Sequence, residues 1–351
     1  MSSTTQYPNE GKVVLVSGAT GFLALHVVDK LLARGYTVIG TARSESKYQP
    51  IVEAFAKRYP KGKLSFEIVS DIGTHDAFDN VFKKNTDIQY VLHTASPFSF
   101  GLNKDLKEAY LDPAVNGTVN ILNAIKSYGP QVTNVVVTSS FASVYDPTPN
   151  LVHKSDTWNP VTWDQVDNEL VAYIASKKYA EKAARDFVKE NDVNFKLATV
   201  NPPYVLGPQL FDFSVKENLN ASNAWLLQNL KIDKTLTTPL DQEPFLAVHV
   251  DDVAEFHVLP LENKKLEDAR MFIAGGPIVA QYVLNVVNKE FPEVQGKVAK
   301  GQPDSADELL KLAPKYDISD IVEKADGYKF IPIEQCITDV LGQYFEHYPL
   351  K

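Results

Sequence analysis

The sequence has a single cysteine among its 351 residues, Cys336, and no long run of apolar residues. One cysteine excludes an intramolecular disulfide, so the composition does not call for an oxidising compartment. No apolar run approaches the roughly 18 residues that a membrane-spanning helix needs. The polar start, residues 1–11, also lacks the apolar core of a signal peptide. We therefore expect a cytoplasmic protein.

The chain also has fewer basic than acidic residues. Lys and Arg number 35 against 44 Asp and Glu, which gives a formal net charge of −9 at pH 7. An acidic surface repels nucleic-acid phosphates and anionic lipid, so neither a nucleic acid nor a membrane is an expected partner. The sequence leaves the oligomeric state open between a monomer and a homodimer.

Two common catalytic signatures are missing as well. There is no H-E-x-x-H zinc motif and no G-x-S-x-G elbow of a serine hydrolase. His249 lies close to Asp251 and Asp252 in the sequence, as in a fragment of a metal site. We interpret Asp251 as the cap of a helix instead, and we expect no metal.

What the chain does contain is a regular alternation of short β-branched runs and helical patterns, typical of an α/β fold with a doubly wound parallel sheet of the Rossmann type. Strands are predicted at 12–16, 37–41, 64–69, 90–93, 134–138, 196–200, 246–250 and 270–274, all in this sheet. Helices are predicted from about 23 to Gly35, at 113–126, at 172–190 and from 251 to about 260.

The length favours two domains. We place a dinucleotide-binding domain at 1–202 plus about 247–275. The regular alternation fades after Pro202, so we assign about 203–246 plus 276–351 to a smaller, mainly helical lobe that binds the substrate.

The turn Gly18-Ala-Thr-Gly21-Phe-Leu-Ala24 lies between the first predicted strand and the first predicted helix. Glycine allows a tight turn there and lets a diphosphate approach the backbone. The following helix offers free N–H groups to that diphosphate. The turn predicts a dinucleotide site, with an ordinary strand-to-helix connection as the alternative. The residues expected to contact the cofactor are Gly18, Thr20, Gly21, Phe22 and Leu23.

The end of the second strand distinguishes NAD from NADP. An NAD site usually has an acidic residue there for the ribose 2′-hydroxyl, whereas this strand ends in Arg43-Ser44. Arg43 offers forked donors for a 2′-phosphate and Lys47 can add charge, so the sequence favours NADPH. The alternative is two solvated surface cations. Asp71-Ile72 is expected near the adenine, although Asp71 also suits a helix cap.

The segment Tyr173-Ile-Ala-Ser-Lys177 places a phenol and an ammonium group at positions i and i+4, on one face of a helix. A neighbouring ammonium lowers the pKa of a phenol, which otherwise is a poor acid–base group at neutral pH. Tyr173 is then able to protonate a carbonyl oxygen. Ser140, which follows a predicted strand, can hydrogen-bond the same oxygen. A tyrosine buried in the core and a turn serine are the alternatives.

Together these motifs resemble the extended short-chain dehydrogenase/reductases. Within that family, the chain resembles the yeast-type NADPH-dependent methylglyoxal/3-methylbutanal reductases and carbonyl reductases, relatives of dihydroflavonol reductase. The further matching motifs are His93-Thr-Ala-Ser-Pro-Phe98, Pro113-Ala-Val-Asn-Gly117, Trp158-Asn-Pro160, Ser176-Lys-Lys-Tyr-Ala-Glu-Lys182, Asn201-Pro-x-Tyr-Val-x-Gly-Pro-Gln209 and Val250-Asp-Asp-Val-Ala254.

The resemblance implies a role for each matching position. Ser140, Tyr173 and Lys177 would form the catalytic triad, and Arg43 and Lys47 would hold the 2′-phosphate. Thr94, Ala95 and Ser96 would lie along the cofactor, and the segment Pro202 to Val205 would lie near the nicotinamide. The residues implied for an apolar substrate pocket are Phe98, Phe141, Leu170 and Tyr204.

These features predict an NADPH-dependent reductase of aldehydes and ketones that acts on a small carbonyl substrate. One alternative is a nucleotide-sugar epimerase or dehydratase with the same Tyr-Lys pair, against which Arg43 argues because such enzymes retain NAD. A second is a catalytically inactive NADP-sensing protein, against which the intact triad argues.

Overall fold

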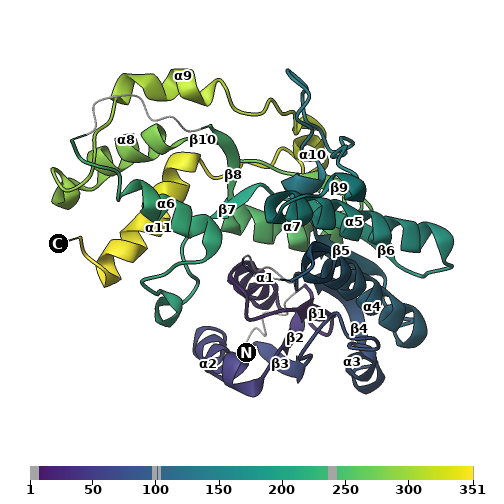
Figure 1. The fold of residues 1–351 in the computed structure, drawn as a ribbon. Coiled ribbons are helices and arrows are strands. Elements are labelled where there is room, and N and C mark those ends of the chain that lie inside the picture. The colour runs from purple at the N-terminus through teal and green to yellow at the C-terminus, as the bar shows by residue number, and fades with distance from the viewer. Residues whose placement is uncertain (1–7, 97–100, 102–103, 236–242, 351) are drawn as a thin grey trace. The chain divides into compact units, whose positions relative to one another are not determined.

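The computed structural model describes residues 8–96, 101, 104–235 and 243–350. The chain divides into two compact units (Figure 1). The first contains residues 1–146, 155–201 and 254–272, and the second contains 147–154, 202–253 and 273–351. The segments 247–253 and 273–275, which we expected in the dinucleotide-binding domain, therefore belong to the second unit.

The first unit is built on a sheet whose seven described strands run in the order β3-β2-β1-β4-β5-β6-β9. Every pairing in it is parallel, as predicted for a doubly wound sheet. The chain order reverses between β1 and β4, and ligands of such sheets bind at the carboxyl ends of the strands next to this reversal. The strands are β1 (Val13–Ser17), β2 (Thr37–Ala42), β3 (Lys63–Ile68), β4 (Ile88–His93), β5 (Asn134–Thr138), β6 (Lys196–Asn201) and β9 (Arg270–Phe272).

Helices connect these strands. Helix α1 ends where the sequence predicted, because Gly35 adopts a φ of +83° just after it. Helix α2 was not predicted: Pro50 lies inside it and only Ile51 and Phe55 are buried, so its apolar face is short. The helices of this unit are α1 (Phe22–Ala33), α2 (Glu45–Arg58), α3 (Asp79–Lys84), α4 (Asp112–Tyr128) and α5 (Glu169–Glu190).

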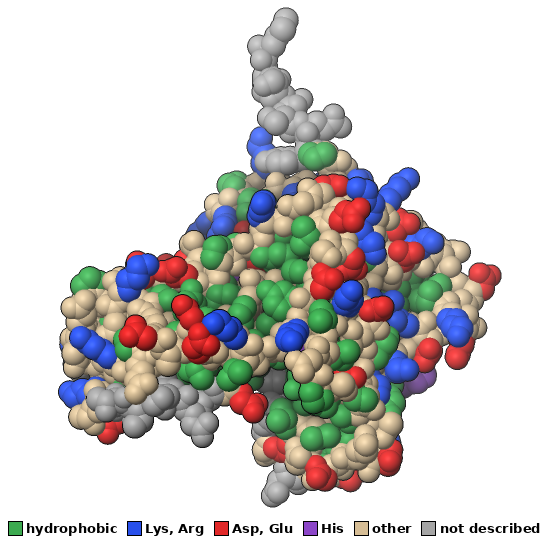
Figure 2. All heavy atoms as spheres, turned by 90° about the horizontal axis from the view of Figure 1, so that it is seen from above, with side chains coloured by type: hydrophobic (Ala, Val, Ile, Leu, Met, Phe, Trp, Pro, Cys, Tyr) green, Lys and Arg blue, Asp and Glu red, His purple; other side chains and the backbone are tan. Residues whose placement is uncertain are grey.

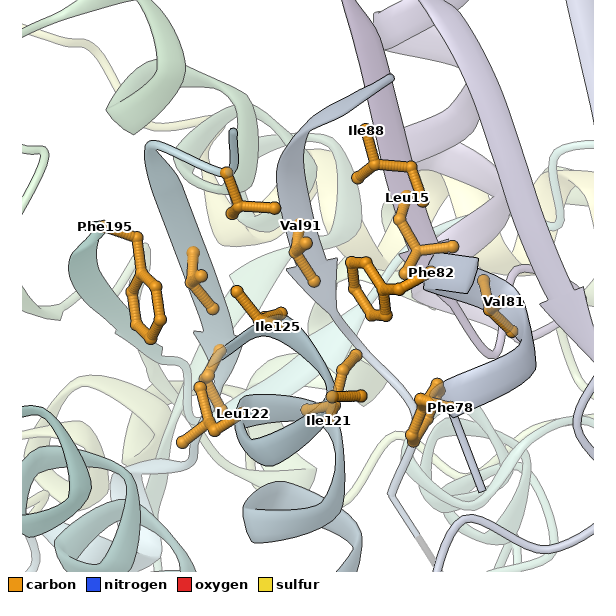
Figure 3. Close-up of a cluster of buried hydrophobic side chains, with 14 of the residues drawn as sticks. Leu15, Phe78, Val81, Phe82, Ile88, Val91, Ile121, Leu122, Ile125 and Phe195 are labelled. Carbon is orange, nitrogen blue, oxygen red and sulfur yellow. The ribbon is translucent and has the colours of Figure 1, made fainter. Parts of the chain in front are cut away.

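A core of buried side chains joins the sheet to the helices on one of its faces (Figure 3). Leu15 and Val91 project from neighbouring strands toward Ile121 of α4 and Phe82 of α3, and all four are fully buried. Burial of one such side chain contributes about 1.5–3 kcal/mol. This core holds the carboxyl ends of β1, β4 and β5 in fixed positions.

The second unit is mainly helical, as predicted, and in addition it has a small sheet of its own, β10-β8-β7. Strand β8 (Phe245–His249) was expected in the large sheet, but it pairs with β7 (Tyr204–Leu206) and β10 (Gly276–Ile278) instead. A fully buried apolar run is compatible with either sheet, and its three-residue partners carry no strand signal. The helices here are α6 (Ala221–Asn229), α8 (Ala280–Glu290), α9 (Ala306–Leu310), α10 (Ser319–Lys324) and α11 (Ile333–His347).

Helix α7 (Val250–Glu262) begins in the second unit and ends in the first. None of the helices in the described part of the chain is long and apolar enough to cross a membrane. The described residues also contain no cluster of three or more His, Cys, Asp or Glu side chains able to hold a metal ion.

Candidate active site

The glycine turn follows β1 and leads directly into α1. Gly18 has a φ of +64°, a conformation that side chains other than glycine rarely adopt. A Cβ at this position would lie 3.0 Å from the Cα of Ala95. No described side chain caps the start of α1, so its first N–H groups are available to an anion.

The turn is anchored to the neighbouring strand. The backbone N–H of Gly18 donates to Thr41 Oγ1 at 3.1 Å, and that of Ala19 donates to the Thr41 carbonyl at 2.9 Å. Thr41 lies near the end of β2, two residues before Arg43. The glycine turn and the end of β2, which Arg43 follows, are therefore held together by hydrogen bonds to the hydroxyl and the carbonyl of Thr41.

A buried hydroxyl joins the ends of β1 and β4. Ser17 Oγ lies 2.8 Å from His93 Nδ1 and accepts a hydrogen bond from the Ala95 N–H at 3.0 Å. The Thr94 hydroxyl donates to the Ser17 carbonyl at 2.5 Å. Burial, and secondly the charge of Lys177, lower the pKa of His93 to about 4, so this histidine is neutral at pH 7. The predicted cofactor contacts Thr94 and Ala95 are thus fixed beside the glycine turn.

Arg43 directly follows β2, and Lys47 lies in the first turn of α2. Both side chains are exposed, and neither forms an ion pair with any residue that the structure describes. Their donors are therefore available to a ligand. The structure brings both to the carboxyl end of β2, the position that the sequence predicted.

The loop after β3 is held by α4. Asp71 Oδ1 accepts from the Gly73 N–H at 2.9 Å, so Asp71 stabilises a turn rather than a helix. Asn120 of α4 donates to the Ile72 carbonyl at 2.9 Å. Gly117 gives the Ile72 side chain room, because a Cβ there would lie 2.7 Å from Ile72 Cδ1.

Tyr173 and Lys177 lie one turn apart on α5. The Lys177 ammonium is 5.6 Å from the centre of the Tyr173 ring, close enough for its charge to act on the phenol. Lys177 also donates to Ser96 Oγ at 2.6 Å. Burial lowers the pKa of Lys177 to about 8, so it remains largely charged at pH 7. The predicted pair is therefore formed, with Ser96 beside it.

Ser140 directly follows Ser139 at the end of β5 and begins the short helix η2 (Phe141–Ser143). Its hydroxyl accepts from the Ala142 N–H at 3.1 Å. The oxygen thus keeps a fixed direction while its own proton stays available to another acceptor. Helices η2 and α5 are in contact, so Ser140 belongs to the same part of the unit as Tyr173 and Lys177.

One functional candidate escaped the sequence analysis. Glu181 of α5 is 1% exposed, and its carboxylate binds Arg270 of β9. It also accepts hydrogen bonds from Ser139 and Ser143, the residues that flank Ser140. The signal lies in the sequence as a glutamate four residues after Lys177, but the neighbouring Ala180 and Ala184 pointed only to a helix face in contact with the core.

A small hollow beside the Tyr-Lys pair is lined by Ser96, Ser139, Lys177 and Glu181, among others. A wider surface hollow is lined by Arg185, Asp192 and Lys196 with their neighbours, and it contains none of the predicted site residues. Of the three predicted catalytic residues, Lys177 lines the small hollow.

Comparison with known families supports this description. A model of the NAD dependent epimerase/dehydratase family matches residues 14–275, which include the glycine turn and the Tyr-Lys pair. The chain belongs to this family. The resemblance to extended short-chain dehydrogenase/reductases is thereby confirmed.

Named members of the family are similar along nearly their whole length. The chain is 40% identical to the NADPH-dependent methylglyoxal reductase GRE2 of Saccharomyces cerevisiae, covering 94% of this chain and 97% of that one. It is 31% identical to aldehyde reductase 2 of Sporidiobolus salmonicolor, over 95% and 96% of the two chains. The crystal structure of Candida albicans Gre2 with NADPH superposes with a TM-score of 0.88 at 37% identity, covering 96% of this chain and 99% of that one.

The residues that the family resemblance assigned to the substrate pocket differ in their contacts and in their exposure to solvent. The Phe141 ring stacks on Phe272 of β9, with ring centres 4.9 Å apart. Leu170, in the first turn of α5, is 60% exposed. Tyr204 is 47% exposed in the second unit, which also contains Pro202 and Val205. Phe98 lies outside the described residues.

Proposed function

We propose that this chain reduces aldehydes and ketones to alcohols with NADPH, and that Tyr173 donates the proton. The observation that carries the proposal is the placement of the Lys177 ammonium 5.6 Å from the Tyr173 ring, on the helix that contacts the Ser140 segment. The positive charge favours the phenolate and so makes the phenol a stronger acid. Tyr173 can therefore transfer its proton to a carbonyl oxygen near neutral pH.

Ser140 completes this arrangement. As negative charge develops on the carbonyl oxygen, its hydroxyl donates a hydrogen bond to that oxygen and stabilises the charge. Lys177 remains charged below pH 8 and supports the phenolate that is left on Tyr173. The products are the alcohol and the oxidised cofactor, with the proton drawn from Tyr173 and replaced from solvent.

NADPH, when bound, supplies the hydride that reaches the carbonyl carbon. The residues present fit this cofactor: the tight glycine turn can approach Ala95 closely because Gly18 lacks a Cβ. The uncapped start of α1 attracts the negative charge of the diphosphate. Arg43 and Lys47, both without an ion pair among the described residues, are suited to the 2′-phosphate.

We assign the remaining predicted roles on the same basis. Asp71 and Ile72 are placed at the adenine end, while Pro202 and Val205 are proposed to contact the nicotinamide. We assign cofactor binding to the first unit and substrate binding to the second. A small apolar carbonyl compound is the proposed substrate, and the cytoplasm the proposed location.

The first experiment follows the loss of NADPH absorbance with methylglyoxal, 3-methylbutanal and an aryl ketone, and repeats each assay with NADH. We expect turnover with NADPH and much slower turnover with NADH. Tyr173→Phe keeps the ring and removes the proton, so kcat should fall by about 10²–10⁴-fold, the range for loss of a general acid. A folded Tyr173→Phe protein with normal kcat would show that another group donates the proton.

A control for the cofactor identity comes from the purified protein itself. If it carries tightly held NAD and does not consume NADPH, the chain is an epimerase or dehydratase and the proposal is wrong. If it binds NADPH but turns over no carbonyl compound, it is an inactive sensor.

A further inference from the structure

We infer that the buried Glu181–Arg270 pair is a positioning device that holds the Ser140 segment in register with the helix that carries Tyr173 and Lys177. This inference rests on the proposed function, because it assigns a role to residues that act through Ser140 and do not touch the substrate. It is carried by the spacing on α5, by the hydrogen bonds on either side of Ser140, and by the contacts of Arg270.

Three functional side chains are regularly spaced on one helix. Tyr173, Lys177 and Glu181 follow each other at intervals of four residues, so they lie along one face of α5. Two of them are the proposed acid and the cation that activates it. The third is 1% exposed and therefore does not serve the solvated surface.

The Glu181 carboxylate accepts hydrogen bonds from both sides of Ser140. Glu181 Oε2 accepts from Ser139 Oγ and from Ser143 Oγ, each at 2.6 Å. These serines lie one residue before and three residues after Ser140. The carboxylate therefore holds the chain on both sides of the proposed catalytic hydroxyl.

Ser143 extends this contact to Ser140 itself. Its hydroxyl oxygen lies 2.8 Å from the Ser140 carbonyl and 2.6 Å from Glu181 Oε2. A hydroxyl has one proton, so these two acceptors share it. Asn201, at the end of β6, donates to the same hydroxyl at 2.8 Å and to Glu181 Oε2 at 2.6 Å. Any shift of Glu181 is therefore transmitted to the Ser140 backbone.

Arg270 contacts both Glu181 and the Ser140 segment. Its Nε donates to Glu181 Oε1 at 2.6 Å, and its Nη2 donates to the Ser143 carbonyl at 3.1 Å. Its remaining terminal nitrogen donates to the carbonyls of Ser155, at 2.8 Å, and of Thr157. One planar group thus fixes the carboxylate, the Ser140 segment and the loop after it, with a geometry that lysine cannot reproduce.

The charges in this pair are retained at the pH at which the enzyme would work. Burial by itself would raise the pKa of Glu181, but the charge of Arg270 and the hydrogen bonds from Arg270, Ser139 and Ser143 outweigh it and lower the pKa to about 2. Buried ion pairs contribute little net stability, because desolvation offsets their attraction. A role in fixing the geometry of the Ser140 segment explains better than a gain in stability why these donors converge on the Glu181 carboxylate.

The test measures the single-turnover rate constant of hydride transfer and the Kd of NADPH in Ser143→Ala, Glu181→Gln and Glu181→Asp. A single-turnover rate constant is first order and does not depend on the concentration of active enzyme. A lower yield of folded protein therefore does not change it. We expect Ser143→Ala to lower it about tenfold or more, since a displacement of about 1 Å can cost roughly 100-fold. The Kd of NADPH should stay within about threefold.

Glu181→Gln leaves Arg270 without its counter-charge and is expected to lower the rate constant further, whereas Glu181→Asp keeps the charge and should restore part of the rate. The matched control is Glu255→Gln, which removes a carboxylate from the ion pair with Arg34, at the end of α1 remote from the glycine turn. It should leave the rate constant unchanged. Where Glu181→Gln does not fold, Ser143→Ala still decides.

An unchanged rate constant in Ser143→Ala would overturn the positioning role, as would a loss of equal size in the Glu255→Gln control. Either result would leave the proposed function in place. Absence of NADPH-dependent carbonyl turnover in the unchanged protein would overturn the proposed function instead, so the two failures are distinguishable.

Discussion

The pKa of the buried residue His93 is lowered by two features of this site, its burial and the charge of Lys177. His93 is 3% exposed at the end of β4, and its Nδ1 lies beside the Ser17 hydroxyl that also binds the Ala95 N–H. Burial disfavours the charged imidazolium, and the nearby Lys177 ammonium disfavours it further. Because its imidazole is neutral, His93 can hydrogen-bond Ser17 beside the glycine turn without being repelled by the Lys177 ammonium.

The pH dependence of stability should follow from this histidine. The pKa of His93 is about 4 when folded and about 6.5 in an unfolded chain. Between these values the unfolded state binds more protons, so stability falls as the pH drops from about 6.5 to about 4. His93→Asn, which cannot titrate, should lose less stability over this window, by roughly 3 kcal/mol.

Urea unfolding of both proteins at several pH values between 7 and 4 measures this difference. The variant starts from a lower stability at pH 7 because its packing is altered. The gap between the two proteins should narrow as the pH falls. Parallel curves would mean that His93 titrates equally in the folded and unfolded states.

At the scale of elements, the β1–turn–α1 unit depends on one glycine for two separate reasons. Gly18 has a φ of +64°, and a Cβ there would collide with the Ala95 backbone. Gly11 has a similar φ of +86°, but among the described residues nothing beyond its chain neighbours lies within 4 Å of a Cβ built there. A substitution at Gly11 therefore introduces backbone strain alone, whereas a substitution at Gly18 introduces both backbone strain and a close contact with Ala95.

Gly18→Ala and Gly11→Ala test this difference. Both should be destabilised by about 1–2 kcal/mol from the left-handed backbone alone. Only Gly18→Ala should also shift the turn away from Ala95 and weaken NADPH binding, by about tenfold, equivalent to about 1.4 kcal/mol. Fluorescence titration with NADPH and urea unfolding measure the two effects. Equal NADPH affinities in the two variants would mean that the turn does not hold the diphosphate.

At the scale of the whole molecule, the formal net charge is −9 at pH 7. Figure 2 shows acidic and basic side chains interspersed over the face that it presents. A cofactor with several phosphate groups therefore needs local positive charge to bind. Arg43 and Lys47 supply it at the carboxyl end of β2.

The rise in Tm that NADPH causes should depend on the positive charge of Arg43. A ligand that binds only the folded state stabilises it by about 2.7 kcal/mol at 100 times its Kd. NADPH should therefore raise Tm more than NADH at equal concentration, and Arg43→Ala should reduce this advantage. The matched control is Lys57→Ala, which removes an exposed cation from the other end of α2. An advantage that persists in Arg43→Ala would place the 2′-phosphate elsewhere.

The sequence determined what depends on local pattern. Strand-to-helix alternation, the glycine turn, the end of α1 at Gly35 and the i, i+4 spacing of Tyr173 and Lys177 all depend on residues near one another in the chain. Each was therefore predictable, as were the parallel sheet and the position of Arg43 at its edge. The family membership followed from the same motifs.

The tertiary structure alone decided which distant segments meet. Strand β8 is apolar and buried in either of two sheets, so only its pairing with β7 and β10 placed it in the second unit. Glu181 resembled any other helix residue until Arg270, 89 residues away, was brought to its carboxylate. A buried charge is recognisable only with its partner, because the partner offsets the free energy of taking it out of water.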